Sequence, residues 1–248
     1  MTSTRAESAR SASAAEPVDR AVELYTEQRW LRAAVQLVPF GVGSAIDALI
    51  TTRGGELARR RVESLLEDLR TAIDQVGQDK VDRAFVGSEE WDDLVIRAFR
   101  AAAETRDREK LRILAAILGG SASVERDPAL DAEALLSAVT ELSPADVELA
   151  RVLHERLSAP RTETEAGMNE LQLWTARLEG DEWIPPAARD DRTFHFHRLE
   201  QAGLISEITG SYLSYGGGAY RLTPTLVRLM ALVEQFVPPP AAPPADDQ

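Results

Sequence analysis

Residues 199–205, Leu-Glu-Gln-Ala-Gly-Leu-Ile, form the pattern that most restricts the fold of this chain. A helical segment that ends at Ala202 meets Gly203, and glycine is the usual residue just after a last helical turn. Leu204-Ile205 then begins a short apolar segment typical of a strand, and a Tyr/Gly-rich interval separates it from Tyr-Arg-Leu-Thr-Pro at 220–224. Because Thr-Pro is a typical helix start, the sequence predicts a helix, a β-hairpin and another helix, in that order.

The segments around this pattern extend the order of elements. Ser143-Pro144 predicts the start of a helix over residues 143–157, because serine caps a helix and proline suits its first position. The other expected elements are a second helix that includes residues 168–178, a third helix over 191–202, strands at 204–208 and 219–222, and a last helix that begins at Thr223-Pro224.

In this order of elements, residues 143–236 resemble the winged helix-turn-helix superfamily of bacterial regulators. The resemblance rests on Leu-x-x-x-Gly-Leu-Ile followed by Tyr-x-Leu-Thr-Pro, and it implies a two-stranded wing and a third helix at the position that enters the DNA major groove. The chain departs from the family in one place, because no glycine follows Thr223-Pro224 closely, where the family often has one.

The first half of the chain predicts an all-helical domain, since its apolar residues recur at helical spacing and no strand pattern is found. Gly119-Gly120 is predicted to stop the last helix of this domain, and Asp127-Pro128 to begin the next helix after a polar boundary. The expected fold class is therefore mostly α, with a short two-stranded β wing. The predicted parts are a disordered tail at 1–16, an all-helical domain at 17–122, a helical, winged-helix-like domain at 128–237 and a disordered Pro-rich tail at 238–248.

The net charge of the chain limits the partners that it can bind. The chain of 248 residues has 41 acidic and 28 basic residues and a formal net charge of -13, which repels nucleic acid and anionic lipid at long range. It has no cysteine, so disulfides, zinc-thiolate sites and thiol catalysis are excluded. No secretory signal pattern is found, so a cytoplasmic protein is expected. Arginine is far commoner than lysine, which suggests a GC-rich bacterial genome.

The winged-helix resemblance raises a DNA-binding regulator as one hypothesis. Against it, residues 167–236 hold six arginines and nine acidic residues, whereas DNA readers neutralise several phosphates with Lys or Arg. We therefore favour a non-enzymatic adaptor or regulatory protein, with a protein partner or self-association. The side chains expected at DNA, if DNA is bound, are Arg192, His195, His197, Arg198, Tyr212, Tyr215 and Arg221. The aromatic residues to consider as interface anchors are Trp30, Trp91, Trp174 and Trp183.

A second alternative is a helical effector at a membrane surface. Residues 33–50 form the most apolar stretch of the chain, and a basic cluster follows it, a pattern typical of membrane-surface elements. Pro39 and two glycines interrupt the stretch, so a buried helical hairpin is favoured. The residues expected at a membrane or an anion, if either is bound, are Arg53, Arg59, Arg60 and Arg61.

No arrangement of residues in the sequence predicts a catalytic or metal-binding site. His195 and His197 stand two positions apart, so they do not share a helix face, and His154 is the only other histidine. No nucleophile with a base, and no metal-ligand set, is recognisable. We expect no enzymatic activity, no cofactor, no metal and no small-molecule ligand.

Overall fold

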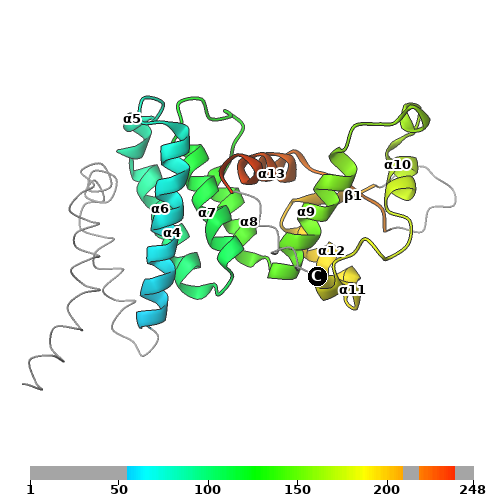
Figure 1. The fold of residues 1–248 in the computed structure, drawn as a ribbon, viewed down its shortest axis with the longest axis horizontal. Helices are drawn as coiled ribbons and strands as arrows, with labels where there is room; N and C mark the ends of the chain where they lie inside the picture. The colour runs from blue at the N-terminus through cyan, green and yellow to red at the C-terminus, as the bar shows by residue number, and fades with distance from the viewer. Residues whose placement is uncertain (1–54, 209–217, 238–248) are drawn as a thin grey trace, which may run out of the picture.

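The computed structural model describes residues 55–208 and 218–237, which are mostly helical with one small two-stranded sheet (Figure 1). This confirms the predicted fold class. The predicted tails, the apolar stretch at 33–50, Trp30, Arg53, Tyr212 and Tyr215 lie outside the described residues. The elements are α4 (Gly55–Val76), α5 (Arg83–Val86), α6 (Glu89–Glu104), α7 (Arg108–Ser121), α8 (Ala132–Glu141), α9 (Pro144–Ser158), the 3-10 turn η1 (Glu163–Glu165), α10 (Glu170–Arg177), α11 (Pro186–Arg189), α12 (Arg192–Gln201), β1 (Ile205–Glu207), β2 (Tyr220–Leu222) and α13 (Pro224–Phe236).

The segment from α12 to α13 has the order that the sequence predicts. α12 is followed by Gly203 at a φ of 70°, in the left-handed region that favours glycine. β1 then pairs with β2 in antiparallel register, with Ile205 opposite Leu222. Thr223 caps α13, because its hydroxyl accepts a hydrogen bond from the backbone N–H of Leu226. Helix, hairpin and helix are all confirmed.

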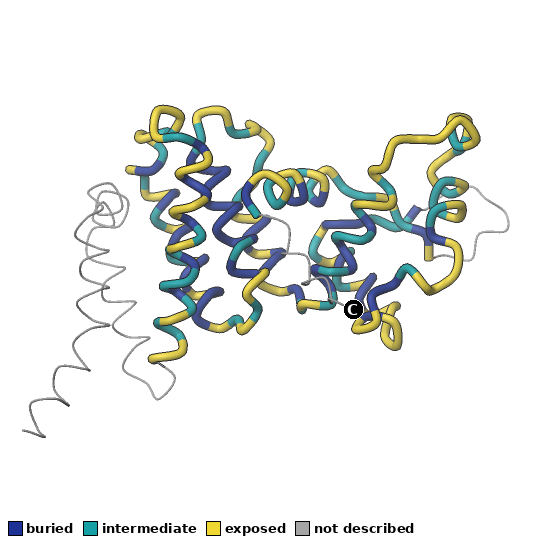
Figure 2. Tube along the Cα trace, viewed as in Figure 1, coloured by how far each residue is buried: buried dark blue, intermediate teal, exposed yellow. Residues whose placement is uncertain are grey.

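Helix α7 is the centre of the N-terminal layer and is buried along most of its length (Figure 2). The prediction that Gly119-Gly120 ends this helix is wrong, since α7 continues to Ser121. Both glycines serve close packing instead. A Cβ atom on Gly119 would lie 2.6 Å from the Cβ of Ala72 in α4, and one on Gly120 would overlap the Leu232 side chain of α13.

The apolar core is continuous from the N-terminal layer to the C-terminal part, with buried leucines such as Leu65, Leu114, Leu153 and Leu229 in one cluster. Helix α13 makes the link, since it lies against α7 (Figure 1). Arg228 of α13 also bonds Asp127 of the α7–α8 connection at 2.7 Å. The predicted boundary at 122–128 therefore falls in a surface connection while the core crosses it.

Two other helix starts differ from the predictions. Asp127 does not begin a helix: its side chain accepts from Ala129 N in a turn, and Asp131 caps α8. The second helix of the C-terminal part, predicted to include residues 168–178, begins at Glu170 after an Asn169 cap. In both places a later Asp or Asn side chain accepts the free N–H groups of the first turn, which fixes the start there.

Between α9 and α10 the chain forms a long exposed connection that one arginine holds in place. The Arg177 guanidinium donates two hydrogen bonds to the Glu165 carboxylate, at 2.8 and 2.9 Å. It also donates to the carbonyl oxygens of Arg156, Ala159 and Pro160 near the end of α9. The hydrogen bonds that Glu165 accepts, first from Arg177 and then from the backbone N–H of Thr162, hold its pKa at about 2.

Candidate functional site

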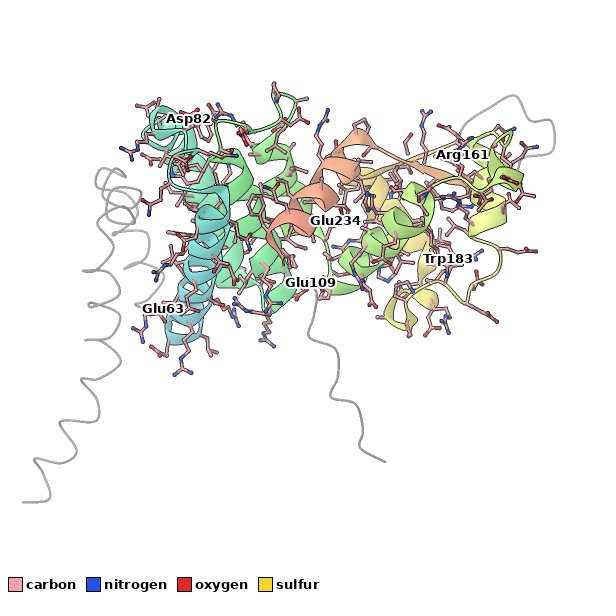
Figure 3. The ribbon with its side chains drawn as sticks, turned by 45° about the horizontal axis from the view of Figure 1, so that its top comes forward. Glu63, Asp82, Glu109, Arg161, Trp183 and Glu234 are labelled. Atoms are coloured by element: carbon pink, nitrogen blue, oxygen red, sulfur yellow. The ribbon has the colours of Figure 1, made fainter. Side chains whose placement is uncertain are left out.

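Helix α12, the third helix of the predicted order, packs between α9 and the hairpin. Its inner side buries His195, Phe196 and Leu199. The Phe196 ring stacks on Tyr220 of β2, with ring centroids 4.9 Å apart. Trp174 and Trp183 complete this half-buried aromatic cluster, and Figure 3 shows Trp183 at this end of the molecule. Trp91, by contrast, is a core residue of the N-terminal layer.

The arginines expected at DNA do not converge on one free surface. Arg192 pairs with Asp181, and Arg221 pairs with Glu170 of α10 at 3.7 Å. Arg198 pairs with Asp146 of α9 at 3.4 Å. Each guanidinium is thus opposed by a carboxylate from a different part of the fold.

The two histidines of α12 point in different directions, as their spacing predicts. His197 is exposed and accepts a hydrogen bond from Gln201 within the helix, at 3.0 Å. His195 is buried, and its Nδ1 lies 2.6 Å from an Asp146 oxygen. His195 is therefore an anchor of the helix and not a surface contact.

Asp146 is the acceptor around which this anchor is built. Its side chain is fully buried, and its second oxygen accepts from both the backbone N–H and the hydroxyl of Ser143, at 2.6 Å each. Burial by itself raises the pKa of the Asp146 carboxyl, but the hydrogen bonds from Ser143 and His195 together bring that pKa below its ordinary value. The Ser143 hydroxyl donates to the carboxylate, so it is not placed for activation by the imidazole.

The turn between α8 and α9, next to Asp146, is held from two sides. Lys110 of α7 is buried and donates to the carbonyl oxygens of Thr140 and Leu142, at 3.0 and 2.7 Å. Burial lowers the pKa of Lys110. From the other side, Arg198 donates to the carbonyl oxygen of Glu141. Lys110 thus fixes this turn to α7, and Arg198 fixes α12 to the same turn.

The outward side of α12 presents an aromatic residue that the sequence reasoning did not select. The residue is Phe194, with 56% of its surface exposed. Exposed Thr193, His197 and Gln201 surround it on the same helix. The signal was present in the sequence: of the two phenylalanines in this helix, Phe196 fits the buried side, so Phe194 must face outward.

The basic cluster on α4 is paired in the same way. Arg59 contacts Glu56 and Glu63 at 3.0 and 3.4 Å, and Arg60 contacts Glu56 at 3.1 Å. Arg61 donates to the carbonyl oxygen of Ala103 at 2.7 Å. These three arginines therefore have partners within the fold.

Comparisons with known proteins assign no family to this chain. No protein-family model, curated protein or solved structure matches this chain. In the parts of the chain that the structure describes, no helix is both long and apolar enough to cross a membrane. Within those same parts, no three His, Asp or Glu side chains gather in a way that would hold a metal ion.

Proposed function

We propose that this chain is a non-enzymatic adaptor or regulatory protein, and that its C-terminal part is a winged-helix-like module that binds protein. The order α9, α10, α12, hairpin and α13 supports the winged-helix assignment. The contact surface in this proposal is the outward side of α12, and its central anchor is Phe194. The partner is another protein or a second copy of this chain.

The observation that carries the proposal is the contrast between three arginines that pair with carboxylates and an exposed aromatic ring on the outward side of α12. DNA affinity comes largely from Lys and Arg groups that neutralise phosphates. Arg192, Arg198 and Arg221 would each have to leave a carboxylate first, in a protein of net charge -13. An exposed phenylalanine needs no such exchange, and aromatic residues are enriched at protein interfaces.

Site-specific photo-crosslinking tests this proposal. The photoreactive residue p-benzoylphenylalanine replaces Phe194, and cells that make the full chain are irradiated. We expect an adduct that protease removes and nuclease does not, and its mass separates a second copy of this 27.2 kDa chain from another protein. The matched control carries the same residue in place of Val124, which is similarly exposed at 57%, and we expect no adduct of that mass from it.

Two results would reject the proposal. A nuclease-sensitive adduct at position 194, together with binding of a random-sequence DNA duplex that weakens steeply with salt, would establish the DNA-binding alternative. Adducts of the same mass and yield from positions 194 and 124 would mean that α12 makes no specific contact with a partner protein.

A further inference from the structure

A cavity of about 450 Å³ lies between α6 and the segment that leads from the end of α7 into α8. Small-molecule sites commonly have volumes of about 300–1,000 Å³, so this cavity is large enough for one. Its floor is apolar, since buried Leu94 and the half-buried side chains of Phe85 and Leu130 line it. Ligand sites combine apolar surface of this kind with a few polar groups that orient the ligand.

Carboxylates line the cavity on both sides of this floor. Glu90 and Asp93 come from α6, and Asp131 and Glu133 come from the start of α8. Glu90 and Asp93 are exposed, and neither has a hydrogen bond or an ion pair within the described residues. The helix dipole favours acids in the first turn of a helix, but Asp93 lies beyond the first turn of α6. The cavity therefore has negative charge that the fold itself does not use.

The two arginines that line the cavity already have partners. Arg97 of α6 pairs with Glu133 of α8 at 2.7 Å. Arg126 pairs with Asp82, labelled in Figure 3, at 2.7 Å, and its guanidinium lies over the Phe85 ring, 4.6 Å from the centroid. Each positive charge in the lining is thus opposed by a carboxylate.

A buried hydroxyl in the lining is also left as an acceptor. Ser121 is buried, and its hydroxyl donates to the carbonyl oxygen of Ile117 at 2.6 Å. A hydroxyl has one hydrogen to donate and two lone pairs, so this oxygen can offer a ligand only its lone pairs. Together with the Glu90 and Asp93 carboxylates, the cavity presents acceptors to a ligand that carries N–H donors and positive charge.

We propose that this cavity binds a linear aliphatic polyamine. An ammonium group carries three donors and a positive charge, and a methylene chain packs on apolar surface while its charged ends stay at the polar rim. Because carboxylates stand on both sides of the apolar floor, a molecule with a cation at each end of an apolar chain matches the cavity better than a single cation. The net charge of -13 draws such cations toward the protein.

This site goes beyond the proposed function, because its lining comes from α5, α6, α7, α8 and the segment before α8, and not from α12. The sequence predicts no small-molecule ligand, since the two sides of the cavity belong to segments that are distant in the chain. The polyamine site and the α12 contact with protein are therefore tested independently.

Isothermal titration calorimetry of the full chain with spermidine, in a low-salt buffer, tests the site. We expect saturable binding of one spermidine per chain. In the double variant Glu90→Gln with Asp93→Asn, affinity should fall by about tenfold, because two partly exposed ammonium–carboxylate contacts are lost. Both acids are exposed and have no partner to lose, so the variant should fold, and circular dichroism checks this.

The matched control removes the same charge elsewhere. Glu67→Gln with Glu104→Gln replaces two exposed acids, one on α4 and one at the end of α6, and we expect spermidine to bind as in the parent chain. Two further ligands test the need for a cation at each end: 1,4-diaminobutane should bind more tightly than n-butylamine. Mg²⁺ has the charge of the diamine without its methylene chain, so an equal concentration of Mg²⁺ should not displace spermidine.

Three results would overturn the proposal. One is a titration with no saturable binding of spermidine to the parent chain. Another is an equal loss of affinity in the two double variants, and the third is displacement of spermidine by an equal concentration of Mg²⁺. Either of the last two would mean that the acids only attract counterions through the net charge of the protein.

Discussion

Replacement of Gly119 by alanine tests whether α7 is packed as closely as the structure indicates. In an isolated helix, Gly→Ala stabilises by about 1 kcal/mol. Here the added Cβ would lie 2.6 Å from the Cβ of Ala72, whereas carbon atoms pack best at about 3.5–4.0 Å. The α4–α7 pair would have to separate by about 1 Å, and overpacking of this kind costs about 1–3 kcal/mol.

The upper end of that range applies, because both atoms are fixed to helix backbones and neither can rotate away. A cost of about 3 kcal/mol against a gain of about 1 kcal/mol leaves Gly119→Ala less stable by about 2 kcal/mol. The measurement is urea unfolding at 25 °C, followed by far-UV circular dichroism. Gly167→Ala is the control, since nothing lies within 4 Å of that Cβ position, and it should change stability by less than about 0.5 kcal/mol.

The compensating variant makes the test specific to the contact. Ala72→Gly together with Gly119→Ala exchanges the two residues across the same interface, so the double variant should return to near the parent stability. Gly119→Ala at or above the parent stability would refute the packing argument. A double variant with no recovery would refute it as well, because the clash would then not be with Ala72.

Three further predictions follow from single side chains. Glu165 has a folded-state pKa of about 2, below its ordinary value, so its contribution to stability is present above about pH 5 and is lost as the pH falls toward 2. In Glu165→Gln or Arg177→Met, the midpoint of urea unfolding should therefore change less between pH 7 and pH 3 than it does in the parent chain. Asp92 has a raised pKa, chiefly because of burial, and its buried Oδ1 has no hydrogen-bond partner within the described residues. The folded state therefore favours the protonated form, and stability falls as the pH rises through the raised pKa. Asp92→Asn should raise the midpoint of urea unfolding at pH 7, and a lower midpoint would contradict this account. Thr223→Ala removes the cap of α13 and the hydroxyl bond to the Leu204 carbonyl, so unfolding in urea should show a loss of about 1 kcal/mol, with Thr223→Ser as the variant that retains it.

The helix starts and ends could be predicted from nearby residues, because those residues themselves make the capping interactions. Ser88, Ser143 and Thr223 each accept a backbone hydrogen bond at a helix start, and Gly203 takes the positive φ that a helix end needs. These interactions span only a few positions, so a sequence reading can find them. Gly119 shows the limit: a glycine that ends a helix and a glycine that lets another helix approach look alike until the other helix is known.

The candidate site was harder to predict because its interactions are distant in sequence. Arg198 and His195 are on one helix, and the acid that turns them inward, Asp146, is 49 positions before the histidine. No pattern near residue 195 signals that acid. The winged-helix resemblance placed Arg192, Arg198 and Arg221 at a DNA surface, whereas the structure gives each of them a carboxylate partner and leaves Phe194 exposed.

The docking of α13 on α7 also affects how the chain must be made. α13 covers Gly120, and its Arg228 stands 101 positions after its partner Asp127. During synthesis the apolar side of α7 that receives Leu232 and Phe236 therefore stays uncovered long after α7 itself has left the ribosome. The N-terminal layer can collapse early, but its core is closed only when residues 224–236 arrive. A nascent chain of this protein should consequently need protection from aggregation until α13 has been added.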